Sequence, residues 1–234
     1  MAYLEGKNLV ASYGVVPILH ECSVEVEKGE LAVIVGPNGA GKSTVMRVLL
    51  GMLNATSGSV SLDGRDISTL STQDRISEGL AFVPQTKNVF PSMTVEENLQ
   101  MGGFIRKDDI SKTIEEVYEL FPILYEKRKQ LAEQLSGGQR QQVAFGRAMM
   151  TRPSVMLLDE PTAGVSPIVM DEIFSNILDV RNAGMAVLMV EQNAQQALNI
   201  ADKGFVLVSG RNEHTGSGKE LINDPVVRKK FLGG

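Results

Sequence analysis

Runs of apolar residues alternate with stretches of helical spacing along most of the chain. Several short runs have the length of a buried β-strand and are bounded by glycine, proline or charged residues: 31–35, 80–83, 155–158, 185–190 and 205–208. Other stretches repeat apolar residues at helical spacing and predict amphipathic helices: 45–50, 95–101, 110–121, 137–150 and 168–181. The alternation of the two kinds of segment predicts an α/β protein.

The first part of the chain interrupts this alternation. Residues 3–35 read as an antiparallel β region, since Ser23–Glu27 alternates polar and apolar side chains. Residues 58–67 read as a hairpin around the turn dipeptide Asp63-Gly64. We therefore expect an antiparallel β subdomain beside the α/β core.

The middle of the chain is predicted to be helical. It contains a capping box at Thr94–Glu97, a strong start signal for a helix. We expect a single domain, 1–234, in which a core formed by 1–85 and 154–234 carries an inserted helical subdomain at 86–153.

A glycine-rich segment, residues 36–44, joins the strand-like run 31–35 to a helical stretch and matches the phosphate-binding loop G-x-x-x-x-G-K-[ST]. Its glycines let the backbone wrap a phosphate chain without a clashing Cβ, and N–H groups at a helix start bind anions. An ordinary glycine turn before a helix is the alternative. The residues expected at the phosphates are Gly36, Asn38, Gly39, Ala40, Gly41, Lys42, Ser43 and Thr44, with Lys42 at the β- and γ-phosphates and Ser43 on Mg²⁺.

A second segment, Leu135–Gln139, has the features of an anion site. Ser136 and Gln139 form a capping box, and Gly137 and Gly138 leave N–H groups exposed at the start of a helix. A plain glycine-softened helix start is the alternative. The chain therefore has two phosphate-type sites that are far apart in the sequence.

Adjacent carboxylates, Asp159 and Glu160, follow the strand-like run 155–158. Carboxylates beside a buried strand are costly unless they have a partner or a task, although a solvent-facing acidic turn is possible. Neighbouring strand residues point to opposite faces, so we expect Asp159 to face Mg²⁺ and Glu160 a water molecule. Gln85, at the end of 80–83, is a neutral donor and acceptor suited to a metal-bound water.

Two further positions lie next to these segments. Glu191-Gln192-Asn193 ends the run 185–190 and is expected at the same edge of the sheet. Tyr13 lies beside Gly14 ahead of the phosphate loop, and its ring either stacks on a base or is a core or edge-strand tyrosine.

Composition narrows the class of protein. Of the 234 residues, 43% are hydrophobic and 22% charged, as in ordinary globular proteins, and the net charge of −5 gives no support for nucleic-acid binding. The longest apolar run, Met185–Val190, falls far short of the roughly 20 residues of a membrane span. No secretory signal is visible, and the lone Cys22, expected to be buried, fits a reducing cytosol.

With these motifs in order, the chain resembles the nucleotide-binding subunit of ATP-binding cassette (ABC) transporters over nearly its whole length. The resemblance is carried by the phosphate loop, the glutamine loop Phe82–Gln85, the signature Leu135–Gln139, the strand 155–160 and Tyr13 at the adenine-stacking position. It implies a P-loop NTPase fold and ATP hydrolysis coupled to solute transport.

Finer stretches resemble the branched-chain amino-acid importers of the LivF type, and related urea or amide importers look similar. These stretches are Phe90–Leu99, Asp159–Pro167, Val190–Asn193 and the ending Phe231–Gly234. The resemblance implies two membrane permease subunits, a solute-binding protein that acts indirectly, and a peripheral place on the cytoplasmic side of the inner membrane.

The resemblance also implies how the residues act. Two cassettes, identical or paralogous, face head to tail, and each ATP lies between the phosphate loop of one and the signature of the other. Ser136 and Gly138 then clamp the γ-phosphate, Ser43, Asp159 and Gln85 serve Mg²⁺, and Glu160 polarises the attacking water.

Two positions depart from the wider family. Gln192 replaces the histidine that usually contacts the γ-phosphate, and Ser166 replaces an aspartate in the loop after Glu160. An amide donates a hydrogen bond but does not titrate, so we expect no limb of the pH–rate profile to disappear in Gln192→Ala.

Three other readings remain at this point: an exporter-type cassette, such as one for lipopolysaccharide, a soluble ABC ATPase acting on DNA or ribosomes, and a binding module without activity. The acidic balance and single cassette speak against the second, and the presence of both Lys42 and Glu160 speaks against the third.

Overall fold

The computed structural model describes residues 2–231, so Met1 and the last residues of the ending 231–234 lie outside the described part. Its centre is a sheet in the order β10-β9-β3-β8-β7-β6. The bounds are β3 Leu31–Val35, β6 Leu80–Val83, β7 Val155–Asp159, β8 Ala186–Val190, β9 Lys203–Val208 and β10 Arg211–Gly216. All neighbours pair in parallel except β9 and β10, which are antiparallel.

Strand β3 shows why this sheet forms. All its residues are buried, with Leu31, Val33 and Val35 packed into one core cluster and Ala32 and Ile34 into the other. A strand covered on both faces reads as a continuous apolar run, which is typical of parallel sheets. The expectation that 3–35 is antiparallel throughout is therefore wrong for 31–35.

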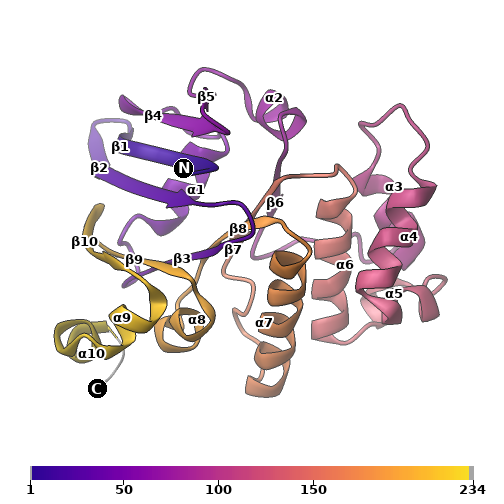
Figure 1. Ribbon diagram of the computed structural model, residues 1–234. Coiled ribbons are helices and arrows are strands. Elements are labelled where there is room, and N and C mark those ends of the chain that lie inside the picture. The colour runs from indigo at the N-terminus through magenta and orange to yellow at the C-terminus, as the bar shows by residue number, and fades with distance from the viewer. Residues whose placement is uncertain (1, 232–234) are drawn as a thin grey trace.

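A second sheet, in the order β2-β1-β4-β5, lies above the central sheet in Figure 1, and its buried side chains share one core cluster with Ala32 and Ile34 of β3. Its strands are β1 Leu4–Tyr13, β2 Val16–Val26, β4 Ser57–Leu62 and β5 Arg65–Asp66. All its pairings are antiparallel, and β4 and β5 turn at Asp63-Gly64, where both residues have positive φ. The expected antiparallel subdomain and its hairpin are confirmed.

Helices between β6 and β7 gather on one side of the molecule, at the right of Figure 1. They are α3 Val95–Gly102, α4 Ser111–Leu120, α5 Pro122–Glu126, a 3₁₀ turn Ala132–Gln134 and α6 Gly137–Met149. Both predicted capping boxes are formed, at Thr94 with Glu97 and at Ser136 with Gln139. Helix α6 then packs against α7, Pro167–Asn182, which returns the chain to the core.

Several elements were not foreseen. They are α2 Thr72–Ser77, α8 Ala194–Ile200 and the strand β10. Ser209 and Gly210, both with positive φ, turn the chain from β9 into β10, and the polar, half-exposed β10 lacks the apolar run that marks the other strands of its sheet. Helices α9 Gly218–Asn223 and α10 Pro225–Phe231 complete the described chain.

Helix α1, Lys42–Leu49, carries the end of the phosphate loop and is held at both ends. Gly41 precedes it with a φ of 100°, a left-handed conformation that suits glycine. At its other end the guanidinium of Arg75, which is 2% exposed, donates to the carbonyls of Val48 and Leu49 at 2.8 Å each. A buried cation on these free carbonyls fixes the helix that presents Lys42.

Among the described residues, no helix combines the length and the hydropathy that crossing a bilayer requires.

Candidate nucleotide site

The phosphate loop lines a cavity of about 430 Å³ at the carboxyl end of β3. Gly36 has a φ of 151°, and a Cβ there would collide with the carbonyl oxygen of Leu207, so only glycine fits. The cavity is lined by Tyr13, Ile18, Asn38, Gly39, Ala40, Gly41, Lys42, Ser43, Thr44 and Glu160. The structure thus brings most of the predicted phosphate-loop residues, Tyr13 and Glu160 into one place.

Lys42 is 5% exposed, and its ammonium group folds back onto its own loop. Its Nζ donates to the carbonyl oxygens of Gly36 at 2.8 Å and Pro37 at 3.2 Å. Burial lowers the pKa of Lys42, and the nearby carboxylates, Glu160 first, partly offset the shift. The cation is therefore held on the loop by neutral carbonyl acceptors, which a negatively charged phosphate oxygen can replace.

Asp159 is the last residue of β7, and its Oδ1 is buried without a hydrogen-bond partner among the described residues. Burial raises the pKa of Asp159, the charge of Glu160 raises it further, and Arg47 and Lys42 oppose the shift. An orphaned buried carboxylate oxygen is costly, which points to a ligand at this position.

Glu160 has already left the strand and has a φ of 45°, a left-handed conformation that non-glycine residues rarely adopt. This backbone, and not the alternation of strand residues, decides where its side chain points. Strained backbone of this kind clusters at active sites, where the surrounding structure holds it in place.

Two amides converge on the Glu160 carboxylate. Gln85 Nε2 donates to Glu160 Oε2 at 3.0 Å, and Gln192 Nε2 donates to the same oxygen at 2.8 Å. The predicted residues Gln85, Glu160 and Gln192 thus meet. Gln85 was expected at a metal-bound water, and in this structure its amide contacts Glu160. The pair of donors orients one oxygen of the carboxylate and leaves the other for a water molecule.

Glu191, at the same edge of the central sheet, had no role in the sequence-based prediction. Glu191 directly follows β8, is 2% exposed, and accepts three hydrogen bonds from Thr162 and Gln192. Burial raises the pKa of Glu191, and those hydrogen bonds oppose the shift. The signal that could have identified it is a carboxylate directly after a fully apolar strand.

Tyr13 lies at the rim of the cavity with 43% of its surface exposed, so it is not a core residue. Arg47 from α1 donates from Nη1 to the Tyr13 hydroxyl at 2.7 Å. The hydroxyl contact fixes the ring while its exposed area leaves room for a planar base.

The signature segment lies elsewhere. Ser136 and Gln139 hold each other across the start of α6, with Ser136 Oγ accepting from the Gln139 N–H at 3.2 Å and Gln139 Oε1 accepting from the Ser136 N–H at 3.1 Å. Gly138 lies against the carboxylate of Glu172, so a side chain there would clash. The signature residues Ser136–Gln139 do not line the phosphate-loop cavity.

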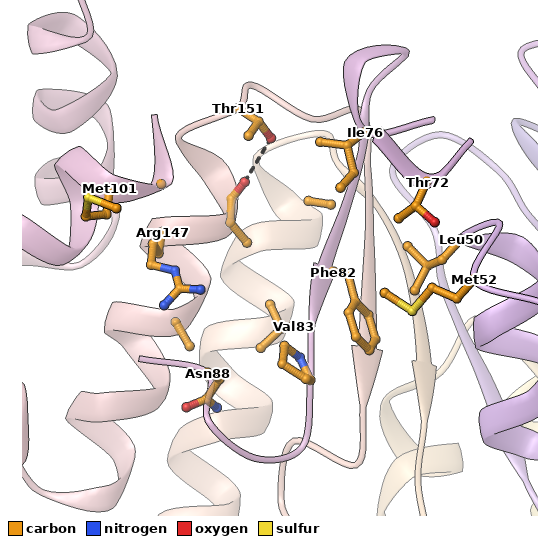
Figure 2. A pocket seen from close by; sticks show the side chains of 15 residues that line it. Leu50, Met52, Thr72, Ile76, Phe82, Val83, Asn88, Met101, Arg147 and Thr151 are labelled. Atoms are coloured by element: carbon orange, nitrogen blue, oxygen red, sulfur yellow. Dashed lines mark hydrogen bonds between the residues drawn. The ribbon is translucent and has the colours of Figure 1, made fainter. Parts of the chain in front are cut away.

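A groove of about 340 Å³ separates the α/β core from the inserted helices. Figure 2 shows Phe82 and Val83 of β6 between Leu50, Met52, Thr72 and Ile76 on the core side and Met101 and Arg147 on the helical side. Arg147 lies 4.6 Å over the ring of Phe90, and its Nη1 is buried without a hydrogen-bond partner among the described residues. The groove is mainly apolar and begins one residue from Gln85.

These features define a P-loop nucleoside triphosphatase. A phosphate loop leads into a helix, and its lysine lies beside two carboxylates at the ends of buried parallel strands. One of these carboxylates is oriented for a water molecule.

Comparison with known proteins refines this class. The family model described as ABC transporter matches residues 19–163, which is more than half of the chain. The chain belongs to the ABC transporter family and is an ATP-binding, ATP-hydrolysing subunit of a transporter, and such subunits dimerise and work with membrane permease components.

Individual relatives extend over the full length. The chain is 45% identical, over 95% of its length and 96% of the relative, to the high-affinity branched-chain amino acid transport ATP-binding protein BraG of Pseudomonas aeruginosa. It is 35% identical, over 100% of its length and 98% of the relative, to the lipopolysaccharide export system ATP-binding protein LptB of Haemophilus influenzae.

Among solved structures, the ADP conformation of an ATP-binding cassette of an ABC transporter superimposes with a TM-score of 0.90 at 30% identity, covering 100% of both chains. The predicted P-loop core with its antiparallel β subdomain is confirmed.

Proposed function

We propose that the chain energises the import of branched-chain amino acids, or of a related small polar solute such as urea or an amide, from the cytoplasmic face of the inner membrane. The observation that carries the proposal is the 45% identity to BraG across almost the whole of both chains, and the meeting of Lys42, Ser43 and Glu160 in one cavity supports it. Import is favoured over lipopolysaccharide export because the identity to LptB is lower.

The site residues have distinct parts in the proposed reaction. Lys42 exchanges the carbonyls of Gly36 and Pro37 for phosphate oxygens, and Tyr13 stacks on adenine. Glu160 accepts a proton from the attacking water with the oxygen that Gln85 and Gln192 do not hold.

Magnesium fits the donor set of the cavity. The buried Oδ1 of Asp159, close enough to Lys42 to feel its charge, has no partner among the described residues. Ser43 lines the cavity that holds Lys42, and Mg²⁺ prefers such oxygen ligands. Ser43 and Asp159 would hold the ion, with Gln85 at one of its waters. Bound there, Mg²⁺ neutralises charge on the phosphate oxygens.

A second cassette completes the site. The start of α6 has helix N–H groups to offer an anion, yet Ser136–Gln139 lie outside the cavity that holds Lys42. A head-to-tail pair, of identical or paralogous cassettes, places the signature of one copy over the γ-phosphate held by the other. ATP binding then closes the pair and hydrolysis reopens it.

The groove of Figure 2 receives a short helix of a membrane permease subunit. Met52 and Met101 expose 54% and 41% of their surfaces at its rim, and adaptable methionines suit an apolar helix. Because the groove begins next to Gln85, movement of the inserted helices shifts a residue that contacts Glu160.

Transport in reconstituted vesicles tests the proposal. The chain is purified with the membrane subunits that accompany it, and ATP-dependent uptake of labelled leucine, isoleucine and valine is measured with a loaded binding protein, with Lys42→Ala as the inactive control. We expect uptake that requires ATP on the side of the vesicle membrane where this chain is bound. Extraction of lipopolysaccharide without amino-acid uptake, or ATPase activity stimulated by DNA, would overturn it.

A further inference from the structure

Glu191 is a buried carboxylate that accepts hydrogen bonds from Thr162, two residues after Glu160, and from Gln192. It does not itself line the phosphate-loop cavity. Its Oε1 accepts hydrogen bonds from the Thr162 N–H at 3.0 Å and from Thr162 Oγ1 at 2.7 Å, and its Oε2 accepts from the Gln192 N–H at 3.0 Å. Glu191 therefore acts on other protein groups.

One of those groups is the turn that contains Glu160. The Ala163 N–H donates to the Glu160 carbonyl at 3.1 Å, and the Glu160 N–H donates to Val190 at 2.9 Å, so the chain reverses directly after β7. A non-glycine residue with a φ of 45° stays there only where neighbouring contacts hold it. Glu191 supplies such contacts, because it holds Thr162 by two hydrogen bonds.

The other group is Gln192, whose side chain donates to Glu160 Oε2 at 2.8 Å. Its backbone N–H is the one that Glu191 Oε2 accepts. One buried carboxylate therefore fixes the backbone on both sides of the Gln192–Glu160 hydrogen bond. Burying a carboxylate is costly, and the three hydrogen bonds from Thr162 and Gln192 offset that cost, so the carboxylate ties these two segments to each other.

We propose that Glu191 is a positioning residue for ATP hydrolysis, which holds the turn after Glu160 and the backbone of Gln192 so that the two side chains meet beside the attacking water. This inference rests on the proposed role of Glu160 as the group that accepts the proton.

The first test is Glu191→Gln in the purified full chain. The amide has the size of the carboxylate but offers one acceptor in place of two, so at least one N–H of Thr162 or Gln192 loses its partner. We expect kcat to fall about tenfold while the Kd for ATP changes less than twofold, since no nucleotide contact is lost. Glu25→Gln, which makes the same change of a carboxylate to an amide in the half-exposed ion pair with Lys203, is the control and leaves kcat unchanged.

A double-mutant cycle separates positioning from general support. If Glu191 acts through Gln192, the Glu191→Gln change lowers kcat much less in a Gln192→Ala background than in the natural chain. Equal losses in both backgrounds, or a loss of ATP affinity that parallels the loss of kcat, would contradict the proposal.

Amide exchange provides a readout that needs neither nucleotide nor activity. In the nucleotide-free protein we expect Glu191→Gln to lower the protection of the Thr162 and Gln192 amides about tenfold or more, with β3 unchanged. If Glu191→Gln does not fold, Thr162→Val removes only the hydroxyl bond and is expected to lower kcat about threefold. Unaltered exchange at both amides would overturn the positioning role. If exchange changes as expected but the natural chain has no ATPase activity, that result would count against the proposed function alone.

Discussion

At the carboxyl ends of β7 and β8, side chains from distant segments hold one another, whereas the start of α6 is held by groups three residues apart. Gln85 and Gln192 reach Glu160 across 75 and 32 residues of sequence, and Glu191 reaches Thr162 across 29. Ser136 and Gln139 need only each other. Contacts between distant segments order the first region. Local contacts alone order the second, which does not line the phosphate-loop cavity of its own chain.

This difference teaches how work is divided within one cassette. Tertiary contacts arrange the edge that carries Asp159 and Glu160, where we propose that hydrolysis takes place. In the proposed head-to-tail pair, the signature offers the N–H groups at the start of α6 to the phosphate that the second copy holds. Changes in the first region should act on hydrolysis or nucleotide affinity, and changes in the second on association.

The largest effect is expected for Glu160→Gln, which removes the proton acceptor and keeps the shape. We expect kcat to fall about 10²–10⁴-fold while ATP remains bound and a dimer accumulates. Phosphate release and size-exclusion chromatography in the presence of ATP measure the two outcomes. Normal turnover would refute the role of Glu160.

Lys42→Ala should come next. The ammonium group donates charge-assisted hydrogen bonds, each worth about 1.5–3 kcal/mol, so ATP affinity should fall roughly 10–100-fold. Titration of a fluorescent ATP analogue measures the change. Unchanged affinity would count against the assignment of residues 36–44 as the phosphate site.

Ser136→Ala tests the other region. It should lower ATP-dependent dimer formation several-fold with no change in ATP affinity of the monomer, while the lost cap costs about 1 kcal/mol of stability. Thr94→Ala, which breaks the equivalent capping box of α3, is the matched control. If both variants impair dimerisation equally, the effect belongs to helix capping and not to the signature.

The smallest effect concerns stability and pH. The pKa of Asp159 is raised in the folded protein, so the native state binds more protons than the unfolded state, and stability falls as pH rises from about 4 through the folded pKa. Asp159→Asn should weaken this dependence and raise the Tm of the nucleotide-free protein at pH 7 by about 2–4 °C for ~1 kcal/mol of relief. Thermal denaturation between pH 4 and 8 measures it, and a lower Tm at every pH would contradict the prediction.

The two regions also explain what sequence patterns can predict. The capping boxes at Thr94 and Ser136 were predicted because their partners lie three residues away. The phosphate loop was predicted because its glycines and lysine form one continuous motif. The order of the strands, the meeting of Gln85 with Gln192 on Glu160 and the role of Glu191 depend on contacts between distant residues, which leave no local pattern.

Cys22 has a practical consequence for measuring how the proposed pair of cassettes opens and closes. It is the single cysteine of the chain, its side chain is fully buried in the core cluster between the sheets, and burial raises its thiol pKa to about 12. At neutral pH it stays protonated and shielded from maleimide dyes. Because the chain also has no tryptophan, one cysteine or tryptophan introduced on the inserted helices would report opening and closing against an optically silent background.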